Sequence, residues 1–517
     1  MMPTSTDLTF AVAGKVPADT EAVLIFIPLG ARPAEGAAAG AVIDEATAKS
    51  VARLIEAGVS NGKARQVRFD LEELKGGRNR RVYVAGLGPA EAITTESIRQ
   101  AAAAATRAII KQRQQKVVVS LPAIAKLTLA QVAEAIAVGS LLAAFHFAEY
   151  KGTAAAKEEE EKNPQRVNIT VLADRSSEKQ LKQAIERATI IADAQNFART
   201  VASRPGNDVN PPELASIARQ LANETGLGCT VLDEKKMLGL GMGGILAVGA
   251  GSIQTPPRMI VLEHKPARPS NKKPLMIVGK AITFDAGGIS IKPAEKMGKM
   301  IFDKCGGMAV LGAMCALARL RSRAHVVGIL ASAENTLSSR AYRPGDILRM
   351  FNGVTVEVTN TDAEGRLVLG DALSWGIERY QPQAVVDLAT LTGGVITALG
   401  RNIAGIMSND DAIVAELISA GEDAGEKMWR LPLGEEQRDQ MKSDPADIVN
   451  SAGREAHPLQ GGAFLSFFVP ADKSVAWAHL DIAGVADTEK ELPLYAKGAT
   501  GWGVRTLLNW IGVRTGG

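Results

Sequence analysis

Two short segments in the second half of the sequence hold the side chains best suited to chemistry. In the first, the apolar run Leu275–Gly279 leads into Lys280 and Asp285, and a glycine-rich turn then leads on to Lys292 and Asp303. A charge at the end of a buried strand costs free energy unless an opposite charge or a metal ion compensates it. We therefore expect these groups to pair with one another or to ligate a metal ion.

The second segment, Asn360–Leu367, reads NTDAEGRL. Asp362, Glu364 and Arg366 alternate along it, and alternate residues of an extended or looped stretch face the same side. The segment is therefore expected to direct two carboxylates and a guanidinium group toward one place.

The two segments together supply four carboxylates with no histidine nearby. Carboxylate oxygens favour hard or borderline divalent cations, and such a set can bridge two ions roughly 3.5–4 Å apart, as in two-metal hydrolases. Alternatively, the same acids form structural salt bridges with Lys280, Lys292 and Arg366. Spacing alone does not decide between the two. A calcium loop of the EF-hand type is not expected, because its ligand pattern is absent. His479, in the sequence WAHLD, is expected to be a core histidine rather than a ligand.

Length and composition indicate a globular protein. The 517 residues exceed what one hydrophobic core usually organises, which predicts two domains. A net charge of +3 and an aromatic content of 4% argue against polyanion binding as the main role. The three cysteines are far apart, which predicts reduced thiols. With no signal peptide or membrane-spanning apolar run recognised, we expect a cytoplasmic protein that does not bind membranes.

β-Branched runs alternate with helical patterns along the chain. This alternation predicts an α/β fold with two domains, each a mixed or mostly parallel sheet flanked by helices, joined by a long helix. We expect an N-terminal α/β domain at residues 1–177, a connecting helix at 178–204 and a C-terminal domain at 205–517. The charged run Lys157–Pro164 is expected to be a solvated loop. The expected strands include residues 22–28, 81–86, 116–121, 166–173, 259–263, 275–279, 326–333 and 384–389.

These motifs resemble those of a known enzyme family. Asn360–Leu367 matches the signature octapeptide of the leucyl aminopeptidase (cytosol aminopeptidase) family, and Gly279–Gly288 resembles its other metal motif. The likeness extends from about Asn196 to Trp510, whereas the N-terminal third resembles the family only in its general strand–helix character. It implies that residues 205–517 form a catalytic metallopeptidase domain, with a role in oligomerisation or regulation expected for the N-terminal domain. The implied activity is the release of N-terminal residues, preferably leucine and other apolar ones, from peptides.

The resemblance also implies a role for each charged residue. Asp285 and Glu364 would bridge two divalent ions, manganese or zinc, which would activate a bridging water and bind the α-amine of the substrate. Asp362 would complete the shell of one ion, and Lys280 and Asp303 that of the other. As a ligand, Lys280 requires a neutral amine, whose pKa burial and the adjacent cations would lower.

Two further cations have implied catalytic roles. Lys292 would stay charged and stabilise the oxyanion of the tetrahedral intermediate. Arg366 would hold a bicarbonate that accepts the proton of the bridging water, in keeping with the lack of another side-chain base. Met300, Thr390 and Gly393 fall where the family lines its pocket for the first side chain. Alternatively, these three are ordinary core and turn residues.

The resemblance implies peptides with a free N-terminus as substrates and a homohexamer as the assembly. The sequence departs from the family pattern at two places. Ala281 stands where glycine is usual, and Gly453–Gln460 replaces a run of small residues near the substrate pocket, which bears on fine specificity. Two other functions remain open. A second role in DNA binding is disfavoured by the near-neutral charge, and an inactive scaffold is disfavoured by the intact ligand set.

Overall fold

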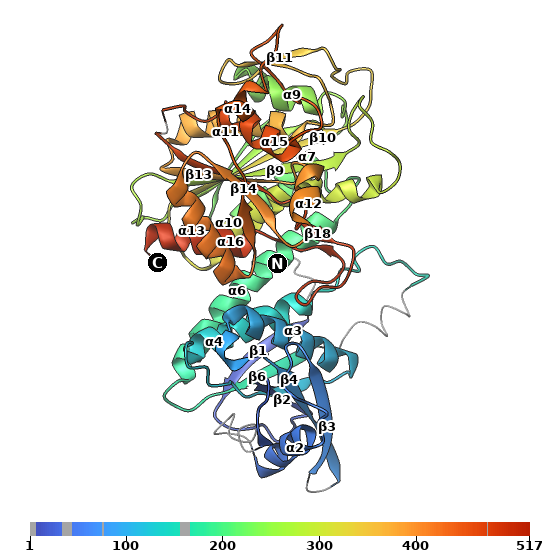
Figure 1. Ribbon diagram of the computed structural model, residues 1–517, viewed down its shortest axis with the longest axis vertical. Helices are drawn as coiled ribbons and strands as arrows, with labels where there is room; N and C mark the ends of the chain where they lie inside the picture. The colour runs from blue at the N-terminus through green and yellow to red at the C-terminus, as the bar shows by residue number, and fades with distance from the viewer. Residues whose placement is uncertain (1–6, 34–43, 75–76, 156–165, 473, 517) are drawn as a thin grey trace. The chain divides into compact units, whose positions relative to one another are not determined.

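The computed structural model describes residues 7–33, 44–74, 77–155, 166–472 and 474–516. The chain divides into two compact units (Figure 1). The N-terminal unit comprises Thr4–Asn196 and Lys490–Lys497, and the C-terminal unit comprises mainly Phe197–Glu489 and Gly498–Gly517. The run Lys157–Pro164, expected to be a loop, lies outside the described residues.

The N-terminal unit is built on a six-stranded sheet with the order β1-β6-β5-β2-β4-β3. All neighbouring strands are parallel except β3, which runs antiparallel to β4. Every residue of β2, whose sequence is AVLIFI, is buried, as is usual for a parallel strand covered on both faces. The strands are β1 (Leu8–Ala13), β2 (Ala22–Ile27), β3 (Val67–Leu74), β4 (Arg78–Gly86), β5 (Lys116–Val119) and β6 (Val167–Leu172).

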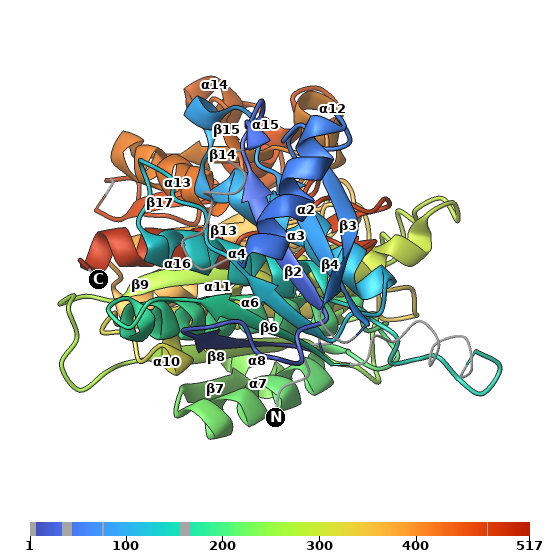
Figure 2. The ribbon, with the colours of Figure 1, turned by 90° about the horizontal axis from the view of Figure 1, so that it is seen from below.

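Alanine-rich helices cover this sheet (Figure 2). Thr94 and Thr128 begin α3 and α4, each with a capping box in which the threonine hydroxyl accepts from a backbone N–H three residues on. The small side chains of both helices pack into one core with alternate residues of β2 and β5. The helices are α2 (Glu45–Glu56), η1 (Ala90–Ala92), α3 (Thr95–Lys111) and α4 (Leu129–Ala143).

A 26-residue helix, α6 (Glu178–Ser203), carries the chain from the N-terminal to the C-terminal unit. It ends just before Pro205 and Gly206, which cannot extend a helix favourably. The next helix, α7 (Pro211–Thr225), begins after Asn210, whose side chain accepts from the N–H of Glu213. These two helices lead into the sheet that holds the candidate site.

The C-terminal unit is built on an eight-stranded mixed sheet with the order β15-β14-β17-β13-β9-β10-β8-β7. Its centre is parallel, with β9 hydrogen-bonded between β13 and β10. The strand β9 runs on past the expected end at Gly279, so that Lys280 and Asp285 are strand residues rather than part of the glycine turn. The strands are β7 (Gly228–Leu232), β8 (Arg258–His264), β9 (Leu275–Asp285), β10 (Val326–Asn335), β13 (Ala384–Ala389), β14 (Ala404–Ser408), β15 (Met428–Arg430) and β17 (Ala476–Asp481).

Two apolar helices pack on the two faces of β9. Glycines permit the close approach. A Cβ on Gly279 would lie 2.5 Å from backbone atoms at the start of α10, and one on Gly376 of α11 would lie 2.7 Å from the sulfur of Met276. The helices are α8 (Glu234–Gly239), α9 (Gly243–Gly249), η2 (Met297–Lys304), α10 (Cys305–Arg319), α11 (Gly365–Tyr380), α12 (Gly393–Leu399), α13 (Asp411–Ala424), α14 (Glu435–Asp439), α15 (His457–Ser466) and α16 (Val504–Thr515).

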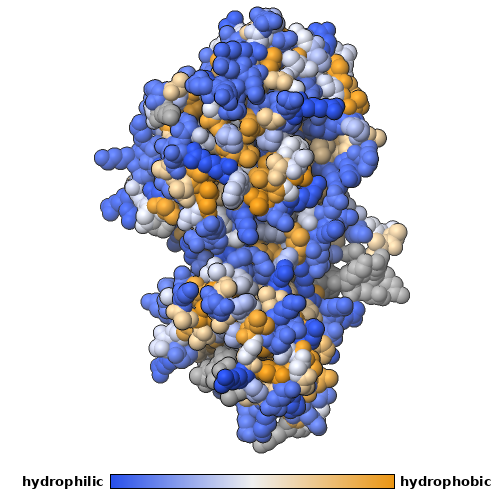
Figure 3. All heavy atoms as spheres, viewed as in Figure 1, coloured by the Kyte–Doolittle hydropathy of each residue, from blue (hydrophilic) through white to orange (hydrophobic). Residues whose placement is uncertain are grey.

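Small strands complete the described part of this unit: β11 (Ile347–Arg349), β12 (Thr355–Glu357), β16 (Ile448–Val449), β18 (Asp487–Thr488) and β19 (Gly498–Ala499). The continuous helical stretch Met297–Arg319 is long and apolar enough to cross a membrane, but 83% of its apolar window is buried, so it is a core element of this unit. In Figure 3, hydrophilic residues cover much of the visible surface and hydrophobic residues are interspersed among them, as on most folded proteins. The architecture confirms the predicted α/β class with two domains.

Candidate active site

The charged residues of the two motifs meet at the carboxyl end of the central strands. Lys280 and Asp285 lie on β9, and Thr390 follows directly after β13. Asp303 comes from η2, and Glu364 precedes α11. In open α/β sheets this edge is where functional sites form. The sheet order therefore joins segments that are far apart in the sequence.

Lys280 is the centre of one half of the site. Its ammonium group lies 2.9 Å from Oδ2 of Asp303 and 2.7 Å from Oε1 of Glu364, and it donates to the carbonyl of Thr390 at 3.1 Å. The side chain of Thr390 donates in turn to Oδ1 of Asp303 at 2.7 Å. Lys280, Asp303 and Glu364 are all buried.

Lys292 organises the other half. Its ammonium group lies 2.8 Å from Oδ2 of Asp285 and 2.6 Å from Oδ1 of Asp362. The other oxygen of Asp285 accepts from the backbone N–H of Gly287 and from the amide of Asn335, both at 2.9 Å. The structure thus brings Lys292 together with the five residues expected to ligate metal ions: Lys280, Asp285, Asp303, Asp362 and Glu364.

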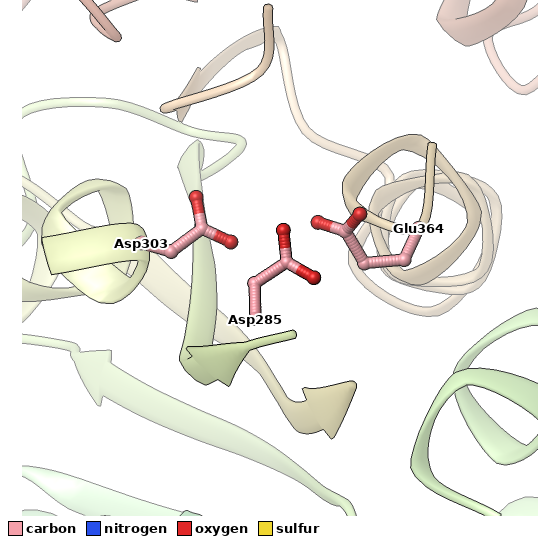
Figure 4. A group of neighbouring side chains, drawn as sticks. All are labelled: Asp285, Asp303 and Glu364. Atoms are coloured by element: carbon pink, nitrogen blue, oxygen red, sulfur yellow. The ribbon is translucent and has the colours of Figure 1, made fainter. Parts of the chain in front are cut away.

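Three of the carboxylates point toward one another (Figure 4). Asp285, Asp303 and Glu364 each offer an oxygen within 4.8 Å of the other two. Oδ2 of Asp303 and Oε1 of Glu364 are buried and lie at ion-pair distance from Lys280, but they accept no hydrogen bond of good geometry from the described residues. A compact set of buried carboxylate oxygens with spare lone pairs fits a divalent cation.

Burial and the neighbouring charges both shift the pKa values of the cluster. Burial and the neighbouring carboxylates raise the pKa of Asp303 to about 6 and that of Glu364 to about 8, although the nearby lysines oppose the rise. Burial alone would lower the pKa of Lys280, but the charges of Asp303, Glu364 and Asp285 outweigh it and raise that pKa. The neutral amine that a ligand role requires therefore depends on the charge of bound metal ions.

Glycines let the backbone approach these groups closely. A Cβ on Gly365 would lie 2.7 Å from Nζ of Lys280, and one on Gly287 would lie 2.8 Å from Oδ1 of Asp362. Gly287 also has a φ of +87°, a conformation that favours glycine. Two motif glycines are thus required by packing around the charged side chains.

Arg366 differs from the sequence expectation. The alternation of Asp362, Glu364 and Arg366 predicted one extended or looped stretch, but Gly365 begins α11, so that Arg366 is a helical residue. Its Nη1 donates to the carbonyl of Asn450 at 2.7 Å, while its Nε is buried without a partner among the described residues. Burial lowers the pKa of Arg366 to about 10, so the group is charged at neutral pH. In the described part of the chain Arg366 forms no ion pair with an acid, so the expected alternative of a structural salt bridge does not hold for this residue.

The three expected pocket residues lie on, or directly after, segments that contribute to the Lys280 half. Met300 is on η2, one turn before Asp303, and Gly393 is the first residue of α12. Thr390 contacts Lys280 and Asp303 as described above, and its position in the sequence did not reveal this role. The sequence also gave no sign of the buried amide of Asn335, which bridges Asp285 and the carbonyl of Thr361 at 3.0 Å.

Asp481 is a further buried residue that supports the site. Its Oδ1 accepts from the N–H of Leu391 at 3.2 Å, and its Oδ2 accepts from the hydroxyl of Thr392 at 2.6 Å. Asp481 therefore holds the loop that carries Thr390 through the two residues that follow it. The WAHLD motif was the available signal for this residue. The expectation for His479 is confirmed, because its Nδ1 lies 2.6 Å from Asp387 in the core.

The departure at Ala281 is accommodated by a glycine on the neighbouring helix. Ala281 is fully buried, and a Cβ on Gly307 of α10 would lie 2.6 Å from its methyl group. The extra methyl therefore packs against a glycine rather than against the end of Lys280.

The chain matches known proteins over most of its length. Models of the cytosol aminopeptidase family match residues 196–508 with its catalytic domain and residues 22–154 with its N-terminal domain. The similarity to the family thus includes the N-terminal third of the chain, where the sequence motifs had shown only a general strand–helix alternation.

Relatives support the same assignment. A probable cytosol aminopeptidase of Roseiflexus castenholzii is 43% identical over 456 residues, covering 88% of this chain and 91% of the relative. One of Burkholderia pseudomallei is 40% identical over 474 residues, covering 92% of both chains. The solved structure of the bottromycin maturation enzyme BotP in complex with Mn superposes with a TM-score of 0.83 at 31% identity, covering 96% of this chain and 100% of that one. The chain therefore belongs to the cytosol aminopeptidase family, and its activity class is that of an aminopeptidase, a hydrolase that acts on peptides.

Proposed function

We propose that this aminopeptidase uses two divalent metal ions and releases leucine and other apolar residues from the N-terminus of peptides. The observation that carries the proposal is the charge of the buried cluster. Four carboxylates face only two ammonium groups, so the cluster is short of positive charge. Burial, together with the neighbouring carboxylates, raises the pKa values of Asp303 and Glu364, and a cation at these groups would favour their charged forms. Divalent cations would supply the missing charge.

The residues divide into two ligand groups. Asp285 and Glu364 are proposed to bridge the ions, Asp362 to complete the shell of one, and Lys280 and Asp303 to complete that of the other. When bound, the ions supply Lewis-acid activation of a water molecule and of the scissile carbonyl and a site for the free α-amine of the substrate. Manganese and zinc are the proposed metals, and the Mn complex of the BotP structure favours manganese.

Lys292 is proposed to stabilise the oxyanion. Burial opposes its charged form, but the charges of Asp285, Glu364 and Asp362 outweigh this and raise its pKa, so the group remains an ammonium. Its side chain is 21% exposed, more than that of Lys280, and is thus the cation of the cluster that solvent and substrate reach. A fixed ammonium beside the reacting carbonyl stabilises developing negative charge.

Arg366 is proposed to hold a bicarbonate, which when bound supplies a proton acceptor. Its guanidinium is buried, charged and free of any ion pair with a described acid. A buried cation of this kind is stabilised by a small anion. Among the described residues, no carboxylate approaches this group within ion-pair distance.

The preference for apolar residues is proposed to arise from Met300, Thr390 and Gly393 beside the Lys280 half. Met300 offers a flexible apolar side chain, and Gly393 leaves space for the substrate. The name of the relatives, probable cytosol aminopeptidase, supports a cytoplasmic location. We further propose a homohexamer, with a role of the N-terminal domain in its assembly or regulation. A salt-sensitive DNA shift assay would test the alternative second role in DNA binding.

Metal analysis combined with an activity assay tests the proposed function. Purified protein saturated with Mn²⁺ or Zn²⁺ should contain two ions per chain and hydrolyse leucine amide, and chelators should abolish the activity. Glu364→Ala should lose bound metal and turnover while the circular dichroism spectrum persists. Protein that binds no metal, or whose activity resists chelation, would contradict the proposal.

A further inference from the structure

A pocket of about 560 Å³ adjoins the charged cluster through Asn360, whose Oδ1 accepts from the N–H of Asp362 at 2.9 Å. None of the three expected pocket residues lines it, although its lining residue Gly394 follows Gly393. Two of its walls come from the segments that carry the site, one just before Asp362 and one at the start of α12. The third wall is the stretch that departs from the family pattern. The lining residues are Thr359, Asn360, Gly394, Ser451, Gly453, Arg454 and His457.

The third wall is held in place by close packing. A Cβ on Gly394 would lie 2.7 Å from Cδ of Pro458 and 3.2 Å from Cβ of His457, so the start of α15 lies directly against α12. The hydroxyl of Thr359 donates to the carbonyl of Ser451 at 2.6 Å. These contacts join the third wall to the other two walls of the pocket.

The lining is rich in hydrogen-bond donors and has no acid. Arg454 is its one charged residue, and among the described residues its guanidinium forms no ion pair or hydrogen bond. Burial and the charge of Arg366 lower the pKa of His457 to about 4, so its imidazole is neutral and carries one N–H donor. The side-chain NH₂ of Asn360 and the hydroxyl of Ser451 likewise donate to no group in the described chain.

Two acids adjoin the lining residues in the sequence, and neither of them lines the pocket. Asp362 lies 2.6 Å from the ammonium group of Lys292, and Glu455, which follows Arg454, is exposed to solvent. An anion in the pocket would therefore meet the positive charge of Arg454 and several neutral donors. A guanidinium with neighbouring N–H and O–H groups is the usual setting for a carboxylate.

We propose that this pocket binds a carboxylate on the part of the peptide that follows the cleaved bond, with Arg454 as its main contact. The inference rests on the proposed function, because the first side chain is then placed at Met300, Thr390 and Gly393, none of which lines this pocket. The carboxylate has two sources. It is the side chain of Asp or Glu at the second position, or the C-terminus of a dipeptide.

Pairs of substrates that differ only in charge test the proposal on the metal-loaded enzyme. Leu-Asp-amide against Leu-Asn-amide reports the side-chain source, and Leu-Gly against Leu-Gly-amide reports the C-terminal source. In at least one pair, kcat/KM for the charged member should be higher by roughly fivefold, the upper range for a solvent-exposed charge pair. Arg454→Ala should abolish this ratio, and Arg454→Glu should reverse it.

Ratios within one variant cancel general effects on activity. Arg268→Ala, a change at an exposed arginine on the loop between β8 and β9, is the matched control and should retain the wild-type ratio. A wild-type ratio of one in both pairs, or a ratio that survives Arg454→Ala, would overturn the proposal. Failure of the wild type to hydrolyse leucine amide would instead overturn the proposed function and this inference with it.

Discussion

The hydroxyl of Thr390 lies 2.7 Å from Oδ1 of Asp303, and the carbonyl of the same residue lies 3.1 Å from Nζ of Lys280. One residue after β13 thus orients two of the proposed metal ligands. Hydrogen bonds of this kind fix the direction in which a ligand presents its lone pairs. The loop is held in turn by Asp481 through Leu391 and Thr392.

Replacing Thr390 with valine should weaken metal binding while retaining the fold. The change removes the hydroxyl that holds Asp303 but keeps the carbonyl that contacts Lys280. We expect the affinity for Mn²⁺ to fall about 10–100-fold, measured by competition with a chelating dye. Thr225→Val, which removes a hydroxyl bonded within α7, should leave the affinity unchanged. Equal affinity in wild type and Thr390→Val would show that Asp303 is oriented without Thr390.

Gly365→Ala should disturb the site without unfolding the protein. The new Cβ would lie 2.6 Å from Cε and 2.7 Å from Nζ of Lys280, so the end of the lysine must move. Displacement of a site residue by a fraction of an ångström is expected to reduce kcat/KM roughly 10–100-fold. Gly298→Ala, which has open space around its new Cβ, is the control. A melting temperature that drops sharply with Gly365→Ala would point to a packing role instead.

The stability of the protein should depend on pH through Asp371, which lies on α11 and contacts none of the proposed metal ligands. Burial raises its pKa to about 7, although N–H groups of Ile245 and Phe351, both at 2.9 Å, oppose the rise. The folded state therefore holds this proton more tightly than the unfolded state, whose carboxyl has a pKa near 3.8. The resulting stabilisation of the folded state is complete below pH 3.8 and is lost as the pH rises from there through about 7.

Asp371→Asn isolates this contribution, since the amide does not ionise. Between pH 5 and pH 8 the wild type should lose about 2–3 kcal/mol of stability relative to the variant. Melting temperatures of both proteins at several pH values measure the difference, in which the other titrating groups cancel. A difference that stays constant across this range would mean that Asp371 is ionised throughout.

Substrates without a free α-amine should be poor. If the proposed metal ions bind that amine, acetylation of a leucine peptide removes a ligand and the fixed position of the scissile bond. Mass spectrometry of an equimolar mixture of acetylated and free peptide should show cleavage of the free one alone. Cleavage of both at the same rate would mean that the assigned orientation of the substrate is wrong.

Much of this architecture could be predicted from the sequence. The apolar strand before Lys280, the helix that ends before Pro205, and the octapeptide Asn360–Leu367 are local patterns, and the structure has each element where the pattern lies. Several strands were not predicted, among them β1, β3, β7, β14, β15 and β17. In β3 the sequence VRFDLEEL leaves few buried residues, because the strand lies at the edge of its sheet.

The supporting residues of the site could not be predicted, because they depend on the order of the strands. Asn335 reaches Asp285 only because β10 pairs with β9 in a register that places these two residues opposite each other. The helical start at Gly365 was obscured by the regular alternation of charges before and after it. The alternation correctly indicated that Asp362 and Glu364 belong to one cluster. Arg366, however, lies on a helix and donates to the carbonyl of Asn450.

The properties of Arg366→Ala should distinguish a bicarbonate-holding role of Arg366 from a structural one. Its guanidinium contacts Asn450 and no described acid at ion-pair distance, so a loop-holding salt bridge with Asp362 or Glu364 is not what keeps it in place. Arg366→Ala should therefore retain metal and lose rate by the 10²–10⁴-fold typical of losing a general base. Bicarbonate added to carbonate-depleted, metal-loaded wild type should raise the rate, and should do much less for the variant. A variant that loses metal or melts at a lower temperature, with bicarbonate affecting neither protein, would assign Arg366 to folding. Metal content, melting temperature and rate, each measured with and without bicarbonate, distinguish these outcomes.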